Sequence, residues 1–182
     1  MTFANFLTIL RLGVIPFFVV ALVYNRPVIA VWIFLAAGIT DILDGFIARY
    51  FDQKTALGAF LDPAADKFLL TATYVTMAIP GLGLLCPIPV WLPVLTIARD
   101  VIIVSIALML HLSYGIKNFP PTVLGKVTTF FQISYAVGIL LKNAYGLPDE
   151  LLNFLLWSVG FLTVLSGLHY IWRVKILIKA AS

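Results

Sequence analysis

The sequence contains few charged residues and almost no cysteine. Only 11% of its 182 residues are charged, whereas water-soluble domains usually carry about 25%. The chain therefore lacks the polar surface that a water-soluble globule needs, and an integral membrane protein is the better interpretation. The single cysteine, Cys86, excludes an intramolecular disulfide framework and any CxxC metal site. The two histidines, His111 and His169, lie near the ends of apolar segments with no metal-ligand partner at a useful spacing.

The abundant residues are apolar, and they fall into six segments. Hydrophobic residues make up 62% of the chain and the mean hydropathy is +1.07. A membrane span needs roughly 20 mostly apolar residues, about 30 Å at 1.5 Å per residue. We therefore predict an all-α membrane domain that comprises residues 1–182, with no separate soluble domain and with spans near residues 9–24, 28–50, 58–79, 91–111, 122–141 and 151–171. Because Arg11 and Pro16 interrupt the first segment, we expect no cleavable signal there and a retained N-terminus.

The basic residues predict the orientation of these spans. With six spans both termini share one side, and that side collects nine basic residues: Arg11, Arg49, Lys54, Lys67, Lys117, Lys126, Arg173, Lys175 and Lys179. The opposite side has two, Arg26 and Lys142. Since cytoplasmic loops carry the excess of lysine and arginine, we expect both termini in the cytoplasm.

Five of the eight acidic residues gather between positions 41 and 66. Asp41 and Asp44 are three residues apart, and Asp62 and Asp66 are four apart, so each pair shares one face of a helix. A short connection joins the two helices, so we expect them to pack antiparallel and to bring four carboxylates to one level near the cytoplasmic interface. We interpret Asp52, in the connection, as a solvated loop residue.

Four carboxylates at one level repel each other and resist ionising together unless cations neutralise them. Oxygen ligands suit Mg²⁺ or Mn²⁺, and four carboxylates are enough for two ions. A two-metal centre of this kind clamps phosphoryl oxygens during in-line displacement. The alternative is that the aspartates are helix caps or interfacial residues, but the paired spacings, the small residues beside them and Arg49, a planar donor suited to phosphate, favour a metal site.

The same stretch resembles the signature of the CDP-alcohol phosphotransferase family. The pattern D-x-x-D-G-x-x-A-R, then eight residues, then G-x-x-x-D-x-x-x-D is matched at all eight positions: Asp41, Asp44, Gly45, Ala48, Arg49, Gly58, Asp62 and Asp66. Members of that family transfer a phosphatidyl or phosphoalcohol group from a CDP-linked donor to an acceptor hydroxyl and release CMP. The resemblance also implies a homodimer in a bacterial-type cytoplasmic membrane, with its active site facing the cytoplasm and no nucleic-acid partner.

The resemblance implies a role for each signature residue. Asp41, Asp44 and Asp62 are expected to be metal ligands, and Asp66 is expected to serve as metal ligand and as general base. The CDP moiety of the donor is expected to contact four further residues: Gly45, Ala48, Gly58 and, at the pyrophosphate, Arg49.

The sequence predicts the acceptor substrate less specifically than it predicts the CDP-linked donor. Arg99 lies within a span beside Asp100, where an arginine is costly without an anionic partner. Adjacent helical residues point about 100° apart, so a bound phosphate or a carboxylate of the aspartate cluster is a possible partner. The stretches NFLTILR, GKVTTFFQ and TVLSGLHY resemble bacterial phosphatidylglycerophosphate synthases, which implies that Arg11, Arg99 and Lys126 hold the phosphate of glycerol 3-phosphate.

Other readings stay open at this point. The Arg99-Asp100 pair, where that subgroup usually has Arg-Glu, also resembles cardiolipin synthases, whose acceptor is phosphatidylglycerol. Phosphatidylinositol phosphate synthases are a third choice. A cation- or proton-coupled transporter is an alternative of a different class, because buried acids often line ion pathways. The lack of an internal repeat and the clustering of the acids at one level weigh against it.

Overall fold

The computed structural model describes residues 3–50, 56–114, 122–146 and 148–181, and side chains for a smaller set that excludes residues 44–50 and 56–63. Across these residues the secondary structure is six α-helices: α1 (Phe3–Val23), α2 (Pro27–Tyr50), α3 (Ala56–Met77), α4 (Trp91–Tyr114), α5 (Val123–Tyr145) and α6 (Asp149–Ala181). The predicted all-α class and the six helices are confirmed.

Local sequence explains where α1 ends and α2 begins. Asn25 adopts the left-handed conformation, with a φ of 53°. The N–H of Asn25 donates to the carbonyl of Leu22 at 2.9 Å, and the N–H of Arg26 donates to that of Ala21 at 2.8 Å. This is the Schellman pattern, which satisfies the last carbonyls of a helix. Pro27 then starts α2 at the position where a missing N–H costs nothing.

The helix α5 has a capping residue at each end. The N–H of Gly125 donates to the Thr122 hydroxyl at 3.0 Å, which makes Thr122 the N-cap. At the other end the N–H of Gly146 donates to the carbonyl of Lys142 at 2.8 Å. The φ of Gly146 is +75°, a conformation that glycine adopts without steric cost.

Among the residues that the structure describes, three helices are long and apolar enough to cross a membrane: Trp91–Leu110 in α4, Val123–Tyr145 in α5 and Asp149–Val174 in α6. The described parts of α1 and α2 contain shorter apolar stretches, Leu7–Val23 and Pro27–Asp41. Six helices are therefore established, whereas six membrane spans stay a prediction.

The outer face of α6 is apolar along most of its length. Five large side chains are 60–70% exposed: Phe154, Trp157, Phe161, Leu168 and Trp172. Their spacings of three, four, seven and four residues place them along one side of the helix. Water-soluble proteins rarely expose apolar surface of this extent, so this face is suited to lipid. Together with the apolar helices it indicates a membrane protein.

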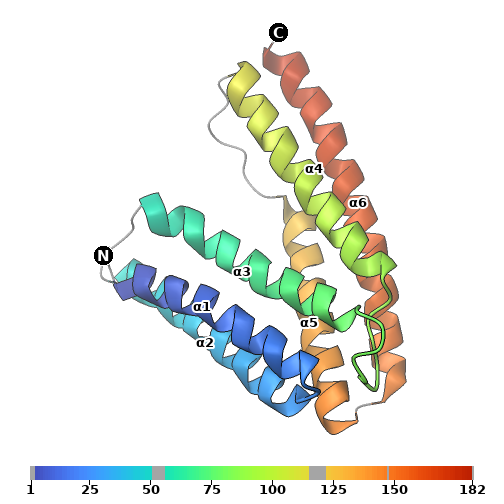
Figure 1. Cartoon of the computed structure of the whole chain (residues 1–182). Helices are drawn as coiled ribbons and strands as arrows, with labels where there is room; N and C mark the ends of the chain where they lie inside the picture. Colours follow the sequence, from blue (N-terminus) through green and yellow to red (C-terminus); the bar gives the residue numbers. More distant parts are fainter. Residues whose placement is uncertain (1–2, 51–55, 115–121, 147, 182) are drawn as a thin grey trace. The chain divides into compact units, whose positions relative to one another are not determined.

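The chain divides into two compact units, one of Met1–Ile88 with Ala136–Pro148 and one of Pro89–Tyr135 with Asp149–Ser182. In the first unit α1 packs against both α2 and α3, and Figure 1 shows it between them. In the second unit α4 packs against α6. Antiparallel packing of α2 on α3, expected from their short connection, stays a prediction. Among the described residues, the extensive helix contacts of this unit are those of α1 with α2 and with α3.

Each unit has its own packing core. In the first, the rings of Phe18 and Phe34 join α1 to α2 with centroids 6.1 Å apart, and Tyr74 and Met77 of α3 are fully buried. In the second, the indoles of Trp91 and Trp157 stack with centroids 6.0 Å apart, which joins α4 to α6.

Candidate functional site

The first unit brings a buried arginine onto two of the predicted metal ligands. Arg11 of α1 donates from Nη1 to Oδ1 of Asp66 at 2.7 Å, and the same nitrogen lies 2.7 Å from Oδ1 of Asp41. The Arg11 side chain is 1% exposed, whereas those of Asp41 and Asp66 are 37% and 51% exposed. Carboxylates from α2 and α3 therefore converge on one cation from α1, and each keeps part of its surface accessible.

The other two predicted ligands lie on the same helices. Asp44 falls within the continuous helix α2 and Asp62 within α3, so the helical spacings of three and four residues are intact. The side chains of Asp44 and Asp62 lie outside the described set, as do those of the four residues expected at the CDP moiety, Gly45, Ala48, Arg49 and Gly58. Among the described residues no three metal-binding side chains come together, so the two-metal centre stays a prediction.

The donor set that is described fits a hard divalent cation. Asp41 and Asp66 offer only carboxylate oxygens, which are the ligands that Mg²⁺ and Mn²⁺ prefer. Both Oδ1 atoms already lie against a positive charge at 2.7 Å. The position between the two carboxylates is therefore one where a cation is stabilised.

The second unit has a separate buried arginine, Arg99 of α4. Its Nη1 donates to Oδ1 of Asp100 at 2.7 Å, and its Nη2 donates to the hydroxyl of Ser166 on α6 at 2.8 Å. The guanidinium carbon lies 5.8 Å from the centroid of the Tyr170 ring, within the range of a cation–π contact. Arg99 is 7% exposed.

The sequence left the partner of Arg99 open, and in the structure its neighbour Asp100 is an ion-pair partner. The side chain of an arginine is long enough to fold back, so two residues that leave the helix about 100° apart still form an ion pair. Ser166 and Tyr170, which the sequence argument missed, hold the rest of the guanidinium. The only signal for them was their place in the stretch TVLSGLHY. Nε of Arg99 is buried with no hydrogen-bond partner in the described part of the chain.

The start of α5 packs closely around the same guanidinium. A Cβ added at Gly125 would lie 3.2 Å from Nη2 of Arg99, 3.2 Å from the hydroxyl of Thr122 and 3.3 Å from that of Tyr170. The N–H of Thr122 donates to the Tyr170 hydroxyl at 3.1 Å. Lys126, which follows Gly125, is exposed. Arg99 and Lys126 belong to the second unit, whereas Arg11 belongs to the first.

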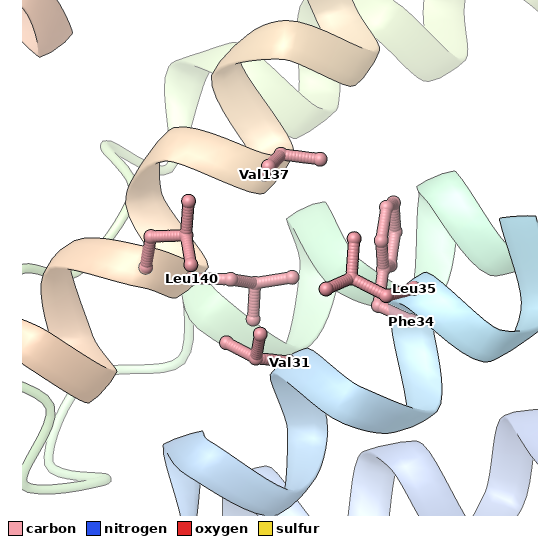
Figure 2. Close-up of a pocket in the computed structure, with 6 residues that line it drawn as sticks. Val31, Phe34, Leu35, Val137 and Leu140 are labelled. Carbon is pink, nitrogen blue, oxygen red and sulfur yellow. The ribbon is translucent and has the colours of Figure 1, made fainter.

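The first unit contains a hollow that is lined only by apolar side chains. It has about 150 Å³ of empty space, part of which is open to the outside, and Figure 2 shows side chains of α2 and α5 around it. The lining residues are Val31, Phe34, Leu35, Val137, Leu140 and Leu141. With no polar side chain among them, this hollow is not where a phosphoryl group reacts.

Comparison with known proteins places most of the chain within one family pattern. The profile described as CDP-alcohol phosphatidyltransferase matches residues 1–166. The chain is 34% identical to the CDP-diacylglycerol–glycerol-3-phosphate 3-phosphatidyltransferase of Haemophilus influenzae, over 93% of this chain and 91% of that protein. It is 34% identical to a probable phosphatidylglycerophosphate synthase of Mycobacterium tuberculosis, over 93% of this chain and 80% of that protein.

Cardiolipin synthases resemble the chain at a similar level. The CMP-forming cardiolipin synthase of Homo sapiens is 31% identical over 93% of this chain, and the matched region spans 60% of that longer protein.

Proposed function

The chain belongs to the CDP-alcohol phosphatidyltransferase family, and we propose that it transfers a phosphatidyl group from CDP-diacylglycerol to a hydroxyl of glycerol 3-phosphate. The products are phosphatidylglycerophosphate and CMP, which makes the reaction a step of phospholipid biosynthesis. The observation that carries the proposal is the convergence of Asp41 and Asp66, two signature carboxylates from different helices, on one cationic point.

In this mechanism the residues of the first unit handle the donor phosphates. Asp41, Asp44, Asp62 and Asp66 would hold Mg²⁺ or Mn²⁺, two ions in all, which when bound neutralise charge on the phosphoryl oxygens. Such transfers depend mainly on positioning and charge neutralisation. We propose that Asp66 takes the proton of the acceptor hydroxyl, and the accessibility of half of its side-chain surface supports this role.

In the proposed step one bond forms and one bond breaks at the β-phosphorus of the donor. As Asp66 accepts the proton, the hydroxyl oxygen attacks the β-phosphorus of the donor, and the bond from that phosphorus to the CMP oxygen breaks. Gly45, Ala48 and Gly58 would line the cytidine pocket, and Arg49 would contact the pyrophosphate. Glycine and alanine suit such a pocket because a backbone without bulky side chains lets a ligand approach closely.

For the acceptor, we propose that Arg99 and Lys126 hold the phosphate of glycerol 3-phosphate. The guanidinium of Arg99 is fixed by Asp100, Ser166 and Tyr170, which limits the entropy lost when it binds an anion. The relatives whose names specify glycerol 3-phosphate or phosphatidylglycerophosphate correspond to this chain over 91% and 80% of their length.

The second candidate is a cardiolipin synthase, in which phosphatidylglycerol is the acceptor. It is favoured by the Arg99-Asp100 pair and by the 31% identity to the human enzyme. Membership of a transferase family leaves the transporter reading without support.

We further propose that all six helices are embedded in a bacterial-type cytoplasmic membrane with both termini in the cytoplasm, and that the protein is a homodimer. The acyl chains of the donor then stay in the bilayer while its head group reaches the aspartates.

An acceptor panel tests the proposed function. Purified protein in detergent would receive CDP-diacylglycerol, Mg²⁺ or Mn²⁺, and one of glycerol 3-phosphate, phosphatidylglycerol, inositol phosphate or serine, with products separated by mass. We expect the highest turnover with glycerol 3-phosphate. Predominant formation of cardiolipin from phosphatidylglycerol would replace the first candidate by the second.

A further inference from the structure

Arg11 carries a permanent positive charge in an almost fully buried position. The side chain is 1% exposed, and arginine does not lose its proton in proteins. Its Nη1 lies 2.7 Å from an oxygen of Asp41 and 2.7 Å from an oxygen of Asp66. The charge at this position is therefore fixed by the chain itself.

This geometry has a consequence for any divalent cation. The Oδ1 atoms of Asp41 and Asp66 already pair with the positive charge of Arg11. A divalent cation bound to the same carboxylates would lie close to the guanidinium, and the two positive charges would repel each other. Interactions between charges a few ångströms apart amount to several kcal/mol in a partly buried site. Arg11 and the cation cannot both make their best contacts with the pair.

We propose that Arg11 is a positioning residue that competes with the divalent cation for Asp41 and Asp66. It holds α1, α2 and α3 together at the carboxylates before a cation binds, and it gives up at least one carboxylate when the cation is bound. This inference rests on the proposed function, because the cation is the one required there. It differs from the phosphate-binding role that the family resemblance implies for Arg11.

The test uses Mn²⁺ as the probe and measures binding directly. Full-length wild-type protein and Arg11→Gln would be purified in detergent, and the free Mn²⁺ would be followed by electron paramagnetic resonance. We expect Arg11→Gln to bind Mn²⁺ at least about tenfold more tightly, because the repelling charge is gone. Arg26→Gln, an exposed arginine between α1 and α2 in the same unit, is the matched control and should bind as wild type does.

Thermal unfolding gives a second readout. Without Mn²⁺, we expect the melting midpoint of Arg11→Gln to fall by at least about 5 °C, because the carboxylates lose their partner. Saturating Mn²⁺ should then raise that midpoint by more than it raises the wild-type midpoint. Arg11→Lys keeps the charge and should stay closer to wild type in both measurements. Arg11→Met, which keeps the length of the side chain, replaces Arg11→Gln if the latter does not yield monodisperse protein.

The outcomes separate this inference from the proposed function. Mn²⁺ binding by Arg11→Gln or Arg11→Met that is equal to or weaker than that of Arg26→Gln, including no binding by any of them, contradicts the competition. CMP release is measured on the same wild-type sample. Release of CMP together with unchanged Mn²⁺ affinity in the Arg11 variants would reject the competition alone and leave the phosphatidyltransferase intact.

Discussion

At the residue scale, two arginines among the described side chains are buried, and each is paired with a carboxylate. Arg11 is 2% exposed and Arg99 is 7% exposed. Arg11 reaches carboxylates on two other helices, whereas Arg99 uses its own neighbour, a serine and an aromatic ring. An unpaired buried charge is strongly unfavourable. Both arginines are therefore held in defined positions by the surrounding side chains.

Gly125 packs closely against the guanidinium of Arg99. We expect Gly125→Ala to lower the free energy of unfolding by about 1–3 kcal/mol, because the added methyl group would lie 3.2 Å from Nη2 of Arg99 and must displace it. If Arg99 holds the acceptor, KM for glycerol 3-phosphate should rise as well. Thermal unfolding and initial rates at varied acceptor concentration would measure the two effects.

Gly13 provides the matched control for that substitution. It also lies within a helix, α1, but a Cβ added there meets nothing within 4 Å. Gly13→Ala should leave stability unchanged or raise it by up to about 1 kcal/mol. Equal effects of the two substitutions would contradict the close packing at Gly125.

At the element scale, one side chain fastens the turn between α3 and α4 to the end of α5. Asn143 accepts a hydrogen bond from the N–H of Cys86 at 3.0 Å and donates to the carbonyl of Cys86 at 2.9 Å. The same Nδ2 donates to the carbonyl of Ile139 at 2.8 Å. Asn143 is 5% exposed, so these bonds are shielded from water and fix the turn.

We expect Asn143→Leu to lower the free energy of unfolding by about 1–3 kcal/mol, because backbone groups of Cys86 lose their partners in a buried place. Asn143→Asp can still accept from the N–H of Cys86, but it places a buried carboxylate oxygen against the carbonyls of Cys86 and Ile139, so it should cost at least as much. Asn153→Leu on the exposed face of α6 should change stability little. Thermal unfolding compares the variants, and an Asn143→Leu protein as stable as Asn153→Leu would argue against these hydrogen bonds holding the turn.

The helices could be predicted from sequence, but the contacts between them could not. The length of the apolar segments predicted the six elements, because apolar length is a local property of the sequence. The last apolar span was predicted to end near Ile171 and ends at Val174. The helix α6 itself continues to Ala181, since lysine, leucine and alanine after the apolar segment are good helix formers.

In the candidate site, too, the positions of residues along their helices could be predicted from sequence, but their side-chain contacts could not. The sequence predicted that Asp41 and Asp66 each share a helical face with a second aspartate. It also predicted that the carboxylates of the two helices lie close together. The contact of Arg11 with Asp66 joins residues 55 positions apart, and the pairing of Arg99 with Asp100 depends on how an arginine side chain folds. Neither follows from local pattern, because both are decided by tertiary packing.

At the scale of the whole molecule, the surface is apolar where a water-soluble protein would be polar. In Trp91–Leu110, Val123–Tyr145 and Asp149–Val174 the buried share of the most apolar window is 22%, 39% and 28%. Most residues of these apolar windows are therefore not fully buried within the protein. A lipid environment accounts for them, and it is where a lipid-linked donor resides.

Phe161 lies near the centre of the apolar segment of α6 and is 69% exposed. We expect Phe161→Lys to cost about 3 kcal/mol of membrane insertion and to reduce the carbonate-resistant membrane fraction. Leu151→Lys, in the first turn of α6, is the control, because a lysine near the end of a span reaches the interface at little cost. A Phe161→Lys protein that becomes more soluble without loss of fold would contradict the membrane assignment.

The most direct test of the central claim is the release of CMP from CDP-diacylglycerol by purified wild type, Asp66→Asn and Asp149→Asn, with glycerol 3-phosphate and Mg²⁺ or Mn²⁺ present. Asp149 is an exposed carboxylate in the first turn of α6, so it controls for loss of a negative charge. The account predicts CMP and phosphatidylglycerophosphate in equal amounts from wild type and from Asp149→Asn, and a rate at least about 10²-fold lower for Asp66→Asn. Full turnover by Asp66→Asn, or no CMP from wild type with any acceptor, would contradict it.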